Sequence, residues 1–141
     1  TEIYTLSLHD ALPIYALEAR RVEFIDCRMT GLKAAGSRLQ DVLFEGCDLK
    51  YAGLRESSIE TCEFVSSQAA EADLSSVKAV HTAFRQCSLR SADFSRSAWR
   101  ECDLRGAAIE GIILDGADLR SSTITAAQAI ELAVLMGLRI G

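Results

Sequence analysis

The sequence is poor in the residues that most often carry chemistry. Its 141 residues include only two histidines, one proline and one tryptophan. Without paired histidines or a C-x-x-C spacing, a zinc site has no support. The nucleotide-binding patterns G-x-x-x-x-G-K-[ST] and G-x-G-x-x-G are also absent, so no cofactor is expected. No apolar run approaches the roughly 18 residues of a membrane span.

The charge balance lacks the basic excess that nucleic-acid-binding domains show. The formal net charge is −5 at pH 7. A mildly acidic chain of this kind argues against direct contact with nucleic acid. By length the chain is one domain.

Residues 1–14, TEIYTLSLHDALPI, match codon for codon the translation of a common sequencing-library adapter. Foreign sequence is excluded from fold reasoning, so we expect the native chain to begin near Tyr15 with its own N-terminus missing. Without Glu2 and Asp10 the net charge becomes −3. The strand edge of the first coil should then be unpaired, which promotes association.

The dominant pattern is a period of five. Every fifth position from Phe24 to Ile124 is apolar, and most are large. The positions two earlier, from Val22 to Ser122, hold only Ala, Cys, Ser, Val, Thr, Leu or Ile. None of these positions is charged, although a quarter of the chain is. A fixed short period over about one hundred residues predicts a solenoid.

Several of these segments resemble the pentapeptide-repeat motif A(D/N)LXX. They are Ala72-Asp73-Leu74-Ser75-Ser76, Ala92-Asp93-Phe94-Ser95-Arg96, Cys102-Asp103-Leu104-Arg105-Gly106 and Ala117-Asp118-Leu119-Arg120-Ser121. The resemblance covers residues 22–124. It implies an all-β, right-handed, four-sided β-helix of about five coils over residues 15–124, with twenty residues per coil. The central apolar residue and the small residue two before it would point inward.

Stacking at twenty residues makes specific predictions about the interior. Phe24, Phe44, Phe64 and Phe84 should form one stacked column. Trp99 should lie over Ala79, a large side chain compensated by a small one. The recurring aspartates and most glycines would sit at or beside the corner turns.

The C-terminal segment, residues 125–141, reads as a helical cap. Thr125 and Gln128 form a capping box, residues 126–136 favour a helix and Gly137 ends it. We expect an apolar stripe of Ala126, Ala129, Ile130, Ala133 and Met136, widened by Leu132, Val134 and Leu135, to cover the last coil. The width of this stripe leaves a second role open, a homodimer through the C-terminal helix, as the resemblance implies for some family members.

The cysteines and His81 offer no catalytic arrangement. Cys27, Cys47, Cys62, Cys87 and Cys102 all occupy the small inward position. They therefore act as small hydrophobic residues, and reduced thiols favour the cytoplasm. His81 lies at a solvent-facing position without a nucleophile beside it. We expect no enzyme activity.

Two hypotheses about function remain. The first is a non-enzymatic protein-interaction or scaffold module with an unknown protein partner. Its candidate surface residues are outward and apolar or aromatic: Leu43, Val65, Tyr51, Ile130 and Val134. Leu43 and Val65 should be neighbours on adjacent coils, and clustered exposed apolar residues favour binding.

The alternative, implied by the resemblance, is a DNA-mimicking protein that binds topoisomerases and protects them from quinolones. Mimicry needs dense negative charge, since duplex DNA carries about one charge per 1.7 Å. Residues 22–124 hold sixteen acids against twelve bases, and Arg85, Arg90, Arg96, Arg100 and Arg105 make residues 85–105 locally basic. This charge pattern counts against the alternative.

Overall fold

The computed structural model describes residues 1–4 and 16–141. Most of the adapter-like segment, with His9 and Pro13, therefore lies outside the described residues. The elements in chain order are β1 (Glu2–Tyr4), β2 (Glu18–Ile25), β3 (Arg38–Glu45), β4 (Ser58–Glu60), β5 (Glu63–Val65), β6 (Lys78–Val80), β7 (Ala83–Arg85), β8 (Cys87–Ser88), β9 (Ala98–Arg100), β10 (Ala107–Ala108) and α1 (Ala126–Leu135).

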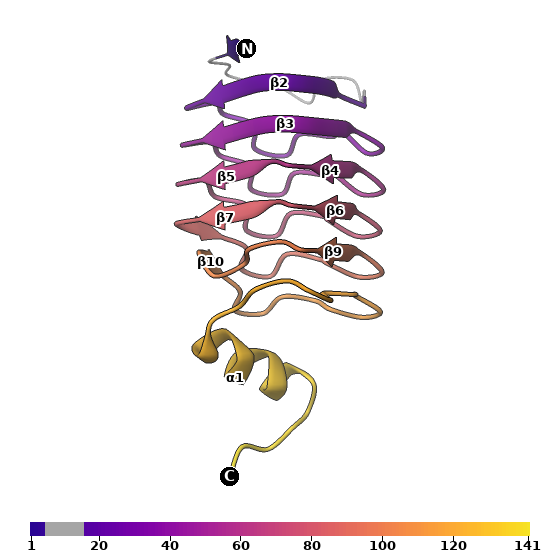
Figure 1. Ribbon diagram of the computed structural model, residues 1–141, viewed down its shortest axis with the longest axis vertical. Coiled ribbons are helices and arrows are strands. Elements are labelled where there is room, and N and C mark those ends of the chain that lie inside the picture. The colour runs from indigo at the N-terminus through magenta and orange to yellow at the C-terminus, as the bar shows by residue number, and fades with distance from the viewer. Residues whose placement is uncertain (5–15) are drawn as a thin grey trace.

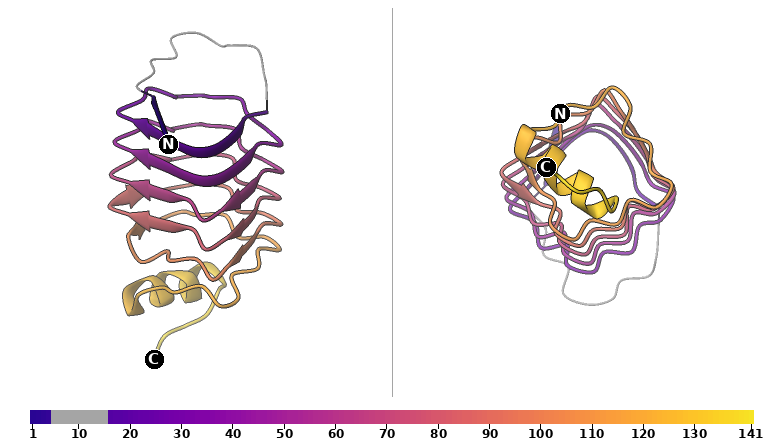
Figure 2. Two further views of the ribbon diagram at one scale, coloured as in Figure 1. Left: turned by 45° about the horizontal axis from the view of Figure 1, so that its top comes forward. Right: turned by 90° about the horizontal axis from the view of Figure 1, so that it is seen from below.

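The strands stack in parallel as a β-solenoid of about five coils (Figure 1). Each residue pairs with the one twenty positions later: Leu39 lies beside Ala19 and Ile59, and Phe44 lies beside Phe24 and Phe64. Viewed along the axis, the coils superpose as a four-sided outline with α1 across one end (Figure 2). The fold class and the twenty-residue coil predicted from the period of five are confirmed.

The five-residue period fits this outline because each repeat makes one side and one corner. At most corners, the residue two past the central position has a left-handed φ, as Tyr51 (60°), Glu56 (61°) and His81 (49°) do. The chain then bends, and the backbone bonds to neighbouring coils. The Gly53 N–H donates back to Leu32 O (2.6 Å), and the Leu54 N–H donates forward to Asp73 O (2.9 Å). The backbone of a coil is therefore hydrogen-bonded both to the coil before it and to the coil after it.

The interior is a continuous apolar core with an aromatic column. Phe24, Phe44, Phe64 and Phe84 stack with centroids 4.9–5.1 Å apart. Trp99 pairs in register with Ala79, is fully buried and stacks on Phe94 at 4.7 Å. Its indole N–H donates to Ser97 Oγ (3.0 Å). The column and the large-over-small pair are confirmed.

Side chains at the small inward positions also form hydrogen bonds with the backbone. Ser37 Oγ accepts from the Leu17 N–H (2.8 Å) and donates to Ala34 O (2.6 Å). Cysteine makes the same kind of bond more weakly, since the Cys47 thiol donates to Phe24 O (3.2 Å) and the Cys87 thiol to Phe64 O (3.1 Å). The sequence had suggested only a packing role for these cysteines.

The glycines confirm the corner expectation with one exception. Gly31, Gly36, Gly46, Gly111 and Gly116 have φ between 65° and 72°. Gly106 does not share this conformation, and a Cβ there would collide with the backbone oxygen of Phe84 and lie 2.7 Å from Arg85 Cα. Gly106 is required by close approach of two coils, whereas the other five suit a left-handed turn.

The first coil does not have the unpaired edge that we expected. β1 pairs in parallel with β2, placing Glu2, Ile3 and Tyr4 beside Val22, Glu23 and Phe24. The expectation is therefore wrong over these three residues of β2. Backbone groups alone make such pairing, so a segment without the repeat pattern can supply it.

The C-terminal helix α1 has the predicted capping box. Thr125 Oγ1 accepts from the Gln128 N–H (3.0 Å), and Gln128 Oε1 accepts from the Thr125 N–H (2.9 Å). Gln128 is buried, and its Nε2 also donates to Leu104 O (2.6 Å) and Ala107 O (2.8 Å). One side chain thus caps both the helix and the last coil. No helix in residues 1–4 and 16–141 is long and apolar enough to cross a membrane.

The predicted covering stripe of this helix is confirmed for Leu132 and wrong for Ile130, Val134, Leu135 and Met136. Gln128 and Leu132 face the solenoid, whereas Ile130 is 53% exposed and Met136 is 73% exposed. Two residues advance a helix by about 200°, so seating Gln128 on the last coil turns Ile130 away from it. The carbonyl groups of the last coil, rather than the apolar stripe, fix the rotation of α1.

Candidate functional site

The interior of the coils is packed throughout the part of the chain that the structure describes. The coil is filled by apolar side chains, and every buried side-chain nitrogen or oxygen in the described residues has a hydrogen-bond partner. No group of three or more potential metal ligands occurs among residues 1–4 and 16–141. His81 lies on the surface, with Nδ1 3.2 Å from Glu101 Oε2.

All five cysteine thiols are buried, and burial makes four of them unsuited to nucleophilic chemistry. Burial raises the pKa of Cys47 and that of Cys62 to about 11. The pKa values of Cys87 and Cys102 are raised for the same reason. Because the thiolate is the reactive form, these side chains should be inert in the folded protein.

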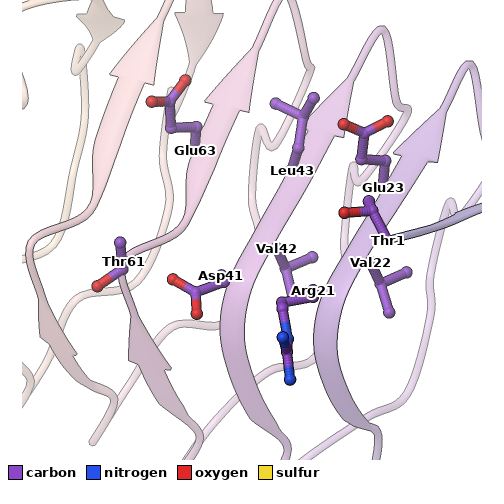
Figure 3. Close-up of a pocket in the computed structure, with 9 residues that line it drawn as sticks. All are labelled: Thr1, Arg21, Val22, Glu23, Asp41, Val42, Leu43, Thr61 and Glu63. Carbon is purple, nitrogen blue, oxygen red and sulfur yellow. The ribbon is translucent and has the colours of Figure 1, made fainter.

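One surface feature is a shallow hollow of about 350 Å³ on the outside of the first coils, called here the corner groove (Figure 3). Arg21, Asp41 and Thr61 follow one side of it on successive coils. Glu23, Leu43 and Glu63 follow the other side in register. Val22 and Val42 lie between the two rows, and Thr1 completes the lining.

The register does not pair Leu43 directly with Val65, which lies two residues further along the next coil. The register puts Glu23 and Glu63 on either side of Leu43, and Glu45 and Arg85 on either side of Val65. Both apolar side chains are half-buried. Each therefore sits within a row of charges, and Leu43 alone lines the corner groove.

Tyr51 belongs to a different side of the solenoid. It occupies a corner with a left-handed φ and is 60% exposed. Its side-chain hydrogen bond with Glu71, on the next coil, raises the pKa of the Tyr51 phenol. Tyr51 is thus an outward side chain with a polar partner, apart from the corner groove.

A second apolar surface is formed by α1 and the segment after it, called here the helix surface. The sequence predicted the apolar residues of α1, but it predicted that they would face the last coil. Its exposed members are Ile130 (53%), Val134 (60%), Leu135 (47%), Met136 (73%), Leu138 (57%) and Ile140 (56%). Exposed apolar residues gathered at one end of a molecule favour an interaction surface.

Several arginines on the later coils pair with aspartates of the repeat, and Arg90 pairs with Glu110 at 2.8 Å. Arg105 pairs with Asp103 at 2.9 Å, and Arg100 and Arg120 both pair with Asp118 at 2.8 and 3.0 Å. Hydrogen bonds from Arg120 hold the pKa of Asp118 below its ordinary value, and those from Arg105 do the same for Asp103. This surface has interspersed charges of both signs.

Comparison with solved structures identifies the same architecture elsewhere. HetL, a pentapeptide repeat protein involved in heterocyst differentiation regulation in the cyanobacterium Nostoc sp. strain PCC 7120, matches with a TM-score of 0.60 and 20% identity. The match covers 76% of this chain and 48% of HetL, so this chain spans about half the length of that relative.

Two further structures are similar. A pentapeptide repeat protein from the Arabidopsis thaliana thylakoid lumen gives a TM-score of 0.51 at 20% identity, covering 75% of this chain and 74% of that one. Trypsin-treated QnrB1, a plasmid-mediated fluoroquinolone resistance protein, gives 0.41 at 14% identity over 99% and 98% of the two chains. At these sequence identities, the similarity to HetL and to the Arabidopsis protein shows a shared fold. The TM-score of QnrB1 is too low to support an argument.

The sequence itself supplies the family assignment. No curated protein matches the chain in sequence. The family model of the pentapeptide repeat region matches residues 37–119, more than half of the chain. This match falls on the coils whose register and inward positions are described above, and the chain therefore belongs to the pentapeptide repeat family.

Proposed function

We propose that this protein is a non-enzymatic protein-interaction module whose outer surfaces bind other polypeptides. The single observation that supports this most strongly is the filled interior, which leaves only the outside of the solenoid for function. Enzymes place reacting groups in a concave site that excludes water. Here the outward side chains lie on the regular sides of the coils.

Two surfaces support binding in different ways. The corner groove combines half-buried Leu43 with charged walls, which suits a polar partner. The helix surface exposes six large apolar side chains, which suits burial against a similar surface. We propose that the helix surface makes a homodimer, with Ile130 and Val134 at its centre because they lie one helical turn apart on the same face.

The alternative of DNA mimicry has less support. Arg100 and Arg105 lie on the later coils and pair with aspartates of the repeat. The surface of these coils therefore carries charges of both signs. A surface that stands in for duplex DNA would need a continuous run of unpaired acids. We also propose a cytoplasmic location, because five buried thiols are most compatible with a reducing compartment.

The proposed binding function is tested by affinity capture with matched variants. Leu43→Glu should abolish enrichment of the partners that the wild-type protein captures. The control Val80→Glu changes another half-buried outward apolar residue, on β6, away from the groove. Unchanged enrichment with Leu43→Glu, or equal loss with both variants, would remove the corner groove from the proposal.

The proposed homodimer has its own test. Light scattering coupled to size exclusion should show a concentration-dependent dimer that Ile130→Glu converts to monomer. Ile113→Glu, which changes an exposed apolar residue on the last coil, is the control and should leave the dimer intact. A wild-type monomer at all concentrations would contradict the proposal.

A further inference from the structure

We infer that Cys27 and Cys47 form a buried two-coordinate site for a soft, thiol-seeking divalent cation between the first two coils. Cys27 follows β2 and Cys47 follows β3, and these strands lie side by side (Figure 1). The Asp48 N–H donates to Cys27 O (2.9 Å), and Arg28 bridges to Asp48 in parallel, so the two cysteines are in register. The inference concerns the interior and is independent of the proposed binding function.

The other three cysteines have no cysteine beside them on a neighbouring coil. By the twenty-residue spacing, Thr82 lies between Cys62 and Cys102. Cys87 pairs in register with Ala107. Only in the pair on the first two coils do two thiols meet, and a side-chain hydrogen bond links them.

The spacing of the coils selects the geometry of the ligand. The stacked rings of Phe24 and Phe44, on the same two coils, have centroids 5.1 Å apart. An ion held in a line by two sulfur bonds of about 2.3 Å spans about 4.6 Å, which is close to this spacing. A disulfide needs sulfurs about 2.05 Å apart, so the coils would have to contract. Zinc is disfavoured because its structural sites take four ligands.

The surroundings of the pair favour a divalent ion over a monovalent one. Both thiols lie in the apolar core, with exposed fractions of 1% and 2%. Binding displaces one proton from each thiol, so an ion such as Hg²⁺ and two thiolates give a neutral complex and two released protons. A monovalent ion would leave a net negative charge in the apolar core, which is costly. Thiolates also select soft cations.

The interactions that the ion replaces are weak. The Cys27 thiol donates to Ile25 O (3.6 Å), and the Cys47 thiol donates to Phe24 O (3.2 Å) and Glu45 O (3.6 Å). A thiol is a weak hydrogen-bond donor, so metal–sulfur bonds more than offset this loss. The ion enters by local opening of the first coil, because the end of a solenoid has a neighbouring repeat on one side only.

The experiment loads the folded protein with one equivalent of Hg²⁺ in excess EDTA and measures retained metal by native mass spectrometry. Cys27→Ser should weaken retention roughly tenfold or more, because one of the two donors is lost. Cys62→Ser is the control, since it removes a buried cysteine outside the pair, and it should change retention less than twofold. Serine already occupies equivalent inward positions at Ser37 and Ser57, so both variants should fold, which circular dichroism checks.

X-ray absorption of the loaded protein gives a second measurement, with two sulfur ligands expected at about 2.3 Å. Three or four sulfur ligands would overturn the two-coordinate site. Equal weakening by the two variants, or no retention by the folded wild-type protein, would remove the pair as the site. Retention of Ag⁺ as strong as that of Hg²⁺ would overturn the preference for a divalent ion.

Discussion

The two ends of the solenoid are closed in different ways. At the C-terminal end, one buried side chain, Gln128, donates to Leu104 O and Ala107 O while it completes the capping box of α1. At the N-terminal end, β1 lies on β2 through strand pairing over three residues, Val22 to Phe24. The first closure requires a particular residue, whereas the second requires only a backbone.

This contrast extends into the core. Near the C-terminal end, Trp99 is enclosed by Phe84 and Phe94, with ring centroids at 5.6 and 4.7 Å. Near the N-terminal end, Phe24 stacks on Phe44 at 5.1 Å, pairs in register with Tyr4 of β1 and retains 7% exposure. In a solenoid each coil is stabilised mainly by its neighbours. We therefore expect the later coils to be the more stable part.

The largest effect should come from truncating the core at the two ends. Trp99→Ala should lower the free energy of unfolding by about 3–5 kcal/mol because it leaves a large cavity. Phe24→Ala should cost less, since the first coil can relax. Urea unfolding followed by far-ultraviolet circular dichroism checks both variants. Equal losses would contradict a less stable N-terminal end.

The two closures can be compared directly by removing each. Gln128→Leu should cost about 2–3 kcal/mol because two buried carbonyls lose their donor. Deleting residues 1–14 should cost less than about 1 kcal/mol, since only three residues of β1 pair with the solenoid. Trp99 fluorescence during urea unfolding is the measurement. A deletion more damaging than Gln128→Leu would reverse the comparison.

Close approach between coils gives the third prediction. Gly106→Ala should destabilise by about 1–3 kcal/mol, because the new Cβ meets the backbone of Phe84 and Arg85. Gly36→Ala is the control: its site has open space, and the only cost is the left-handed φ of 72°. Thermal unfolding midpoints should rank Gly106→Ala below Gly36→Ala, and the opposite order would contradict the steric explanation.

The smallest effect should be an alkaline loss of stability from the buried thiols. The folded pKa of Cys62 is raised to about 11, whereas an exposed thiol titrates near 8.5. Its stabilisation is therefore complete below the unfolded pKa and is lost as pH rises toward about 11. At pH 9, Cys62→Ala should recover about 1 kcal/mol relative to its own cost at pH 7.

The acid range provides the control for this alkaline effect. Hydrogen bonds lower the folded pKa of Asp103 and Asp118, so their contribution is complete above the unfolded pKa and is lost as pH falls through the folded value. Urea midpoints from pH 2 to 10 should therefore decline at both extremes. Cysteine substitution should alter only the alkaline side, and a change on the acid side would contradict the assignment.

The repeat itself was predictable residue by residue, because a five-residue period leaves no choice about which side chains point inward. Phe44 between Phe24 and Phe64, Trp99 over Ala79 and the capping box at Thr125 all followed from spacing. The helix rotation did not follow, because Ile130 is more apolar than Gln128 and sequence periodicity favours apolar burial. Nothing in that periodicity records that Leu104 O and Ala107 O need a donor.

The candidate surfaces, like the fold, were only partly predictable from the sequence. Outward positions such as Leu43 and Tyr51 were found from the repeat frame, but their surroundings depend on residues twenty positions away on both sides. The sequence by itself determined the coil, its register and its filled interior, since these follow from a local period and from side-chain volume. Tertiary structure alone decided the corner groove, the outward turn of Ile130 and the closure of both ends, because each depends on backbone groups and charges brought together only when the coils stack.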